Sequence, residues 1–108
     1  MKPIETEPQL QSAINKDLKE MGVYFMHLKS SGKHRSINPL KGIADIHLLD
    51  RNIYIELKYG RYSYLKPEQE EFKNWCIRKG HPYYLVTSMI EWEILKRKLN
   101  LESDIEKI

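Results

Sequence analysis

The hydrophobic positions of this chain change their spacing several times, and each change marks the boundary of an expected element. From 8 to 21 the apolar residues recur every three or four positions, which predicts a helix with one buried face. That face consists of Leu10, Ile14, Leu18 and Met21. Pro8 suits the first turn of this helix, and Gly22 suits its end. The apolar run at 23–28 then predicts a strand.

The middle of the chain combines a long polar segment with two alternating segments. Residues 29–43 are rich in serine, glycine, asparagine and proline and predict a loop. A loop of this length in a small domain is more often functional than idle. Residues 44–49 and 52–58 alternate between apolar and polar side chains, which predicts the two strands of a hairpin.

The last third of the chain predicts a helix at 67–79, a strand at 82–87 and a helix at 88–99. Ser88 suits the N-cap of the last helix, with a glutamate three residues later. The core positions expected in the middle helix are Phe72, Trp75 and Cys76. The order of elements is helix, three strands, helix, strand, helix. This order predicts an α/β (α+β) fold with a mixed central sheet flanked by helices.

The hairpin carries the candidate chemistry. If its turn centres between Asp50 and Arg51, one face holds only apolar residues, which are Ile46, Leu48, Ile53, Ile55 and Leu57. The other face holds Asp45, His47, Tyr54, Glu56 and Lys58. A buried apolar face fixes the register of a strand pair. Asp45 and Glu56 are therefore expected to lie directly opposite each other, with Cβ atoms about 4.5–5.5 Å apart.

Two carboxylates in this arrangement repel each other, and a divalent cation between them would reverse the penalty. Mg²⁺ suits such a site, because it takes one or two carboxylates, keeps several waters and bridges to phosphate oxygens. Lys58 follows Glu56 by two positions, so its ammonium is expected to reach the same phosphate or the attacking water. The alternative is that Asp45 and Lys58 decorate a solvated sheet face, as polar residues of an alternating strand usually do.

Composition limits the class of protein. The 108 residues fit a single domain at 1–108, with a core at about 7–99 and a tail at 100–108. Hydrophobic residues make up 41% and charged residues 31%, which is typical of a globular chain. A single cysteine excludes an internal disulfide and a multi-cysteine zinc site. The sequence shows neither a membrane-spanning run nor a signal-peptide core, so we expect no membrane partner and a cytoplasmic location.

Basic residues concentrate in the long loop before Asp45. They are Lys29, Lys33, Arg35 and Lys41. We expect them to bind the phosphates of nucleic acid without reading its sequence. The alternative is an ordinary solvated loop. No segment resembles a base-reading helix, which favours selectivity for DNA shape or structure.

Three short motifs together resemble the VRR-NUC branch of the PD-(D/E)xK nuclease superfamily. They are Gly42-Ile43-Ala44-Asp45, Ile55-Glu56-Leu57-Lys58 and Leu65-Lys66-Pro67-Glu68-Gln69. The resemblance extends to Glu7-x-x-Leu10-Gln11 and Ser31-Gly32 and covers about 7–87. Ala44 stands where the superfamily name has proline, a tolerated departure. The chain is similar to compact stand-alone members of the kind found in phages.

The resemblance implies a restriction-endonuclease-like core and a set of roles. The implied ligands of Mg²⁺ or Mn²⁺ are Asp45, Glu56, the backbone carbonyl of Leu57, and Glu7 as an additional acid. Lys58 would position or activate the water, and Gln69 would orient Lys58 or the water. Each has a plainer alternative, since Glu7 also complements the positive end of a helix and polar residues such as Gln69 are common in a first turn.

The implied activity is that of a metal-dependent DNA endonuclease. Similar compact nucleases are homodimers that resolve branched DNA such as four-way (Holliday) junctions, in a bacterial or phage-infected cell. One alternative is a nickase or exonuclease acting on flaps or ends through the same site. Another is a nucleic-acid-binding module without catalysis, against which the intact Asp45, Glu56 and Lys58 argue.

Overall fold

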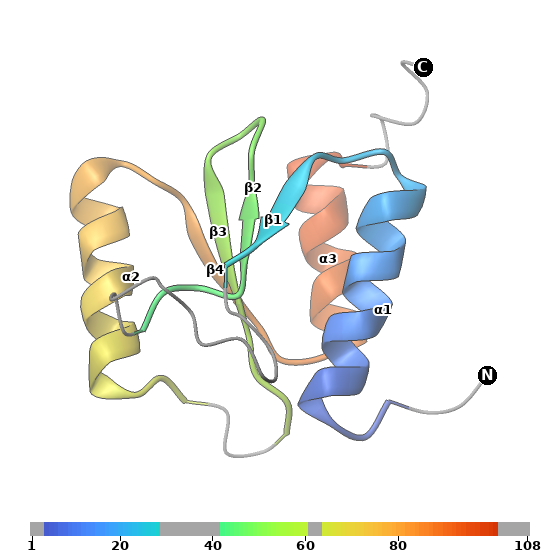
Figure 1. Ribbon diagram of the computed structural model, residues 1–108, viewed down its shortest axis with the longest axis horizontal. Helices are drawn as coiled ribbons and strands as arrows, with labels where there is room; N and C mark the ends of the chain where they lie inside the picture. The colour runs from blue at the N-terminus through green and yellow to red at the C-terminus, as the bar shows by residue number, and fades with distance from the viewer. Residues whose placement is uncertain (1–3, 29–41, 61–63, 102–108) are drawn as a thin grey trace. The chain divides into compact units, whose positions relative to one another are not determined.

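The structure is a computed structural model that describes residues 4–28, 42–60 and 64–101 (Figure 1). Its contacts divide the chain into two compact units that alternate along the sequence. Unit 1 comprises 1–24, 57–63 and 86–108, and unit 2 comprises 25–56 and 64–85. Each unit is described by itself. The expected single domain stays a prediction.

A four-stranded sheet runs in the order β1-β2-β3-β4, mostly within unit 2. Its strands are β1 (Phe25–His27), β2 (Ile46–Leu48), β3 (Ile53–Leu57) and β4 (Tyr83–Val86). β2 pairs antiparallel with both β1 and β3. β4 runs parallel to β3, because the Tyr54 and Lys58 N–H groups donate to Pro82 and Val86, four residues apart on both strands. The predicted mixed sheet is therefore confirmed, although each strand is shorter than expected.

In unit 2, helix α2 (Pro67–Lys79) lies against one face of the sheet (Figure 1). Its contacts with Tyr54 and Glu56 show that this face carries the polar residues of β3. The Phe72 ring meets the rings of Tyr54 and Tyr83, with centroid distances of 5.1 and 6.2 Å. The helix covers the predicted span and ends at Gly80 in the left-handed conformation, as such termini commonly do.

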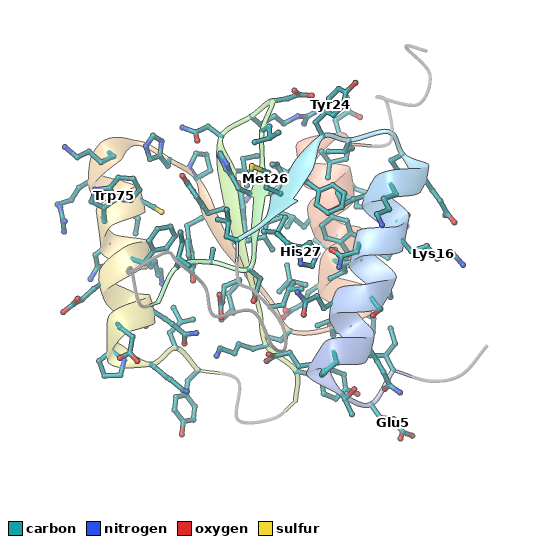
Figure 2. The ribbon with its side chains drawn as sticks, viewed as in Figure 1. Glu5, Lys16, Tyr24, Met26, His27 and Trp75 are labelled. Atoms are coloured by element: carbon teal, nitrogen blue, oxygen red, sulfur yellow. The ribbon has the colours of Figure 1, made fainter. Side chains whose placement is uncertain are left out.

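The expected core positions of α2 are only partly confirmed. Cys76 is fully buried, but Phe72 is half-buried and Trp75 is 36% exposed. Trp75 contacts the rings of Phe72 and His81 at the side of α2 (Figure 2). The core prediction for Trp75 is therefore wrong, because its ring belongs to an aromatic cluster at the surface of unit 2.

In unit 1, helices α1 (Glu7–Glu20) and α3 (Met89–Leu99) lie side by side (Figure 1). All four residues of the predicted α1 stripe are buried, which confirms that stripe. Thr6 and Gln9 form a capping box at the start of α1, a signal that the sequence argument did not use. Ser88 caps α3 as predicted, accepting a hydrogen bond from the Glu91 N–H.

Asp17 joins the two helices of unit 1 through its carboxylate. One oxygen accepts hydrogen bonds from the indole Nε1 of Trp92 and from Nζ of Lys96, each at 2.7 Å. Trp92 is fully buried and Lys96 is 6% exposed. Burial acts to lower the pKa of Lys96, but the hydrogen bonds that its ammonium donates to Asp17 and Glu93, together with their charges, outweigh it and raise the pKa above its usual value. The ammonium therefore stays charged inside the unit.

The packed part of unit 1 continues beyond the expected boundary at 99. Asn100 adopts the left-handed conformation that ends α3, and Leu101 is fully buried. The buried core therefore includes Leu101, which the sequence analysis assigned to the tail. Within the described segments, no helix is both long enough and apolar enough to cross a lipid bilayer.

The Asp17 contacts give a stability prediction. Replacing Asp17→Ala removes the acceptor of a buried indole N–H and one partner of a buried ammonium, and we expect the unfolding free energy to fall by about 2 kcal/mol. Urea unfolding of the variant and the wild type measures this change. The control is Glu20→Ala, an exposed acid of the same helix, expected to change stability by less than about 0.5 kcal/mol. Equal losses in both variants would contradict the proposed link.

Candidate functional site

The hairpin has the register that its apolar pattern predicts. The paired residues are Ile46 with Ile55, His47 with Tyr54, and Leu48 with Ile53. The His47 and Tyr54 rings stack with centroids 4.4 Å apart, so these two residues share a face. One further step of the same register places Asp45 opposite Glu56. The predicted register is therefore confirmed for the paired residues 46–48 and 53–55, and the approach of the two acids stays a prediction from it.

Both carboxylates of this pair are buried. Asp45 is 6% exposed and Glu56 is 1% exposed. The alternative of a solvated sheet face for Asp45 and Lys58 therefore does not hold for Asp45, whereas Lys58 is half-buried. A buried carboxylate is unfavourable unless hydrogen bonds or an opposite charge compensate it. The pair thus calls for compensation from its surroundings.

Part of that compensation comes from Gln69 in the first turn of α2. Its Nε2 donates to Oε2 of Glu56 at 2.9 Å, and its Oε1 accepts from the Lys66 N–H at 2.8 Å. Because both ends of the amide are engaged, its orientation is fixed and the Glu56 carboxylate is held in place. The group that Gln69 orients in the structure is Glu56. Its role toward Lys58 or water stays a prediction.

Gly42 brings the segment before Asp45 against the same end of α2. It has a φ of +83°, and a Cβ at this position would overlap the backbone carbonyl of Glu68. Only glycine combines this backbone conformation with such a close approach. The glycine of the Gly42–Asp45 motif thus places Asp45 near the helix turn that supplies Gln69.

Tyr83 on β4 is a further polar residue beside this pair, and sequence reasoning missed it. The hydrogen bond from the Tyr54 N–H to Pro82 sets Tyr83 next to Tyr54, on the face covered by α2. Its hydroxyl oxygen is buried and has no hydrogen-bond partner in the described part of the chain. Burial, and then the charge of Glu56, raises the pKa of Tyr83 well above its usual value.

No local signal in the sequence separates Tyr83 from Tyr84, since both lie in one short apolar strand. Only the pairing of β4 with β3 tells which of them faces the carboxylates.

Cys76, near Tyr83, has its pKa raised to about 11 by burial, so it is a neutral thiol and not a nucleophile.

Lys58, Leu57 and Glu7 belong to unit 1, so their placement relative to the carboxylate pair stays a prediction. Lys58 is half-buried, and its N–H donates to the Val86 carbonyl at 3.0 Å. Leu57 is buried at the end of β3. Glu7 is exposed in the first turn of α1, where it also complements the positive helix end. Among the described residues, no group of three or more His, Cys, Asp or Glu side chains forms a metal site.

His47, the remaining polar residue of the hairpin face, is part of a hydrogen-bonded chain. Its Nε2 lies 2.8 Å from Oδ1 of Asn52, whose Nδ2 lies 2.6 Å from Nδ1 of His81. Together with its stacking on Tyr54, this chain gives His47 a packing and hydrogen-bonding role. The predicted phosphate-binding residues Lys29, Lys33, Arg35 and Lys41 lie outside the described residues.

Comparisons with family models, with curated proteins and with solved structures return no match for this chain. The resemblance to VRR-NUC nucleases therefore depends on the motif residues of the chain itself.

The Gly42 contact predicts a specific loss of stability. Gly42→Ala adds a methyl group where the Glu68 carbonyl lies, so we expect it to cost at least about 3 kcal/mol by combining backbone strain with overlap. Gly80→Ala is the matched control, because Gly80 has a similar φ of +77° but no atom within 4 Å of an added Cβ. It should cost only about 1–2 kcal/mol. Chemical denaturation compares the two, and equal costs would show that Gly42 makes no close contact.

Proposed function

We propose that this chain is a metal-dependent DNA nuclease whose cation is held by Asp45 and Glu56. The observation that carries the proposal is the burial of two carboxylates, Asp45 directly before β2 and Glu56 in β3, which the hairpin register extended by one step places opposite each other. Exposed acids in this pattern would be ordinary, whereas buried carboxylates are unfavourable unless hydrogen bonds or opposite charges compensate them, and a divalent cation is one group that does so. Mg²⁺ or Mn²⁺ meets that need through oxygen ligands.

The donor set fits such an ion. Asp45 and Glu56 offer carboxylate oxygens, and Gln69 keeps Glu56 oriented by a direct hydrogen bond. The proposal adds the backbone carbonyl of Leu57 as a ligand and Glu7 as an additional acid. When bound, the ion supplies an acidified water and stabilises the charge that develops on the phosphate.

The remaining chemistry falls to the side chains of the protein. Lys58 would position the attacking water or neutralise the phosphate, as its location two residues after Glu56 suggests. The basic residues Lys29, Lys33, Arg35 and Lys41 would bind the DNA backbone without reading bases. Catalysis and DNA retention are thus assigned to different parts of the chain.

The resemblance to VRR-NUC nucleases supports the choice of DNA as substrate. It also supports a restriction-endonuclease-like arrangement of the fold, a homodimer, and selectivity for branched or four-way junction DNA. These finer points belong to the proposal, which covers cleavage in the cytoplasm of a bacterial or phage-infected cell.

Cleavage is the first test of this proposed function. Asp45→Asn or Lys58→Ala should lower Mg²⁺-dependent cleavage by at least about 10²-fold, because the first removes a charged ligand of the cation and the second removes a positive charge that would stabilise the reacting phosphate. DNA binding should persist in both variants. Labelled linear, nicked, flap and four-way substrates incubated with Mg²⁺ or Mn²⁺ measure this and also reveal the preferred DNA structure.

The matched control for cleavage is Asp50→Asn, which removes an exposed acid in the turn of the same hairpin. It should cleave as the wild type does. Cleavage that survives Asp45→Asn or Lys58→Ala would refute the assigned roles. DNA binding without cleavage by the wild type would instead favour a non-catalytic binding module.

The second prediction concerns the cation itself. Mn²⁺ at about 100 times its Kd should stabilise the wild type by about 2.7 kcal/mol, because it binds only the folded state. That gain should raise Tm by several degrees, and Asp45→Asn should lose most of the shift. Thermal unfolding with and without Mn²⁺ measures both. Equal shifts in the two proteins would mean that the ion binds elsewhere.

A further inference from the structure

We propose that Tyr83 is a third polar group of this site, whose hydroxyl donates a hydrogen bond to the water or phosphate oxygen at the Asp45–Glu56 cation. The inference rests on the proposed function and deepens it, since it adds a group from β4 to a site otherwise built on the hairpin. Its support comes from the position, the burial and the charge surroundings of the Tyr83 side chain.

The position follows from the order of the strands. β3 lies between β2 and β4, so Glu56 has Asp45 on one side and the Tyr83 strand on the other. Neighbouring strands lie about 4.8 Å apart. Tyr83 pairs with Tyr54, two residues before Glu56, and so its side chain shares the face that carries the acids. Its ring also meets Phe72 of α2, which covers that face.

The burial of the hydroxyl is the feature that needs an explanation. A tyrosine on a packed face contributes mainly through its ring. Phenylalanine provides the same ring without a polar atom, so packing alone does not explain the hydroxyl of Tyr83. The Tyr83 oxygen is buried and makes no hydrogen bond to any described residue. A buried hydroxyl without a partner is unfavourable, so we infer that its partner lies outside the described residues, and we assign this role to a bound water or ligand oxygen.

The surroundings indicate which chemistry this partner has. The charged groups that act on Tyr83 are Glu56, Asp45 and Glu70, together with the thiol of Cys76. A neutral tyrosine hydroxyl carries one proton and is therefore available as a donor. A donor beside two carboxylates suits an oxygen that arrives with a cation, such as metal-bound water or a phosphate oxygen. Gln69 already holds Glu56, so Tyr83 is not needed for that purpose.

Tyr83→Phe tests the inference because it removes only the hydroxyl. We expect the metal-free Tm to stay the same or rise, since a buried unpartnered group is lost. We expect the Mn²⁺-dependent Tm shift to shrink and kcat for Mg²⁺-dependent cleavage to fall about tenfold, with KM for DNA little changed. A purely structural hydroxyl would not produce this combination.

The control is Tyr84→Phe, the same change at the next residue of β4, which alternation places on the opposite face. Its cation response and cleavage should match those of the wild type. An unchanged cation response and kcat in Tyr83→Phe would overturn the inference. So would a lower metal-free Tm, because it would reveal a structural partner within the protein.

The Mn²⁺ responses of the wild type and of Asp45→Asn show whether a negative result concerns Tyr83 alone or the proposed function on which the inference rests. If the wild type responds to Mn²⁺ and Asp45→Asn does not, the site stands, and the Tyr83→Phe result decides the inference alone. If the wild type shows neither cation-linked stabilisation nor cleavage, the proposed function fails and the inference fails with it.

Discussion

The register of the β2–β3 hairpin is the constraint on which the rest of the site depends. The apolar residues of one face, including Ile46 and Ile55, are fully buried, and a slip by one position would turn them to the opposite side. The same register places two acids together on the other face. Hydrophobic burial therefore imposes an arrangement that electrostatics alone would oppose. The energy that orders the hairpin is also the energy that holds the carboxylates in proximity.

Helix α2 fixes the surroundings of this pair of acids. Its first turn approaches Gly42 through the Glu68 carbonyl and binds Glu56 through Gln69, while Phe72 packs on the rings further along the sheet. The three contacts link the segment before β2, the strand β3 and the helix. Because Gln69 is fixed at both ends of its amide, Glu56 has little freedom to turn away. A preorganised carboxylate loses less entropy when it binds a cation.

Periodic patterns predicted the parts of the structure that depend on one segment or one turn. The helix spans, the α1 stripe and the hairpin register followed from apolar spacing, because a single buried face determines each of them. Trp75 was misplaced, because spacing along α2 does not reveal how far the sheet extends beneath it. Tyr83 and the target of Gln69 could not be predicted, since they depend on the pairing of β4 with β3 and on helix packing. Those contacts join residues distant in sequence, which periodicity does not encode.

On the proposed nuclease function, the charge of the candidate centre determines how a phosphate can bind there. The chain carries a net charge of +3, but its candidate centre is built from two buried acids. An acidic pair repels a phosphate, and burial strengthens the repulsion because less water screens it. If the centre acts on DNA as proposed, a cation that reverses the local charge would allow the phosphate to approach. On the proposed function, the ion has two roles. It allows the phosphate to bind beside the acids, and it activates the attacking water. A neutral donor such as Tyr83 then suits the site, because it adds a hydrogen bond without competing for the carboxylates as a second positive charge would.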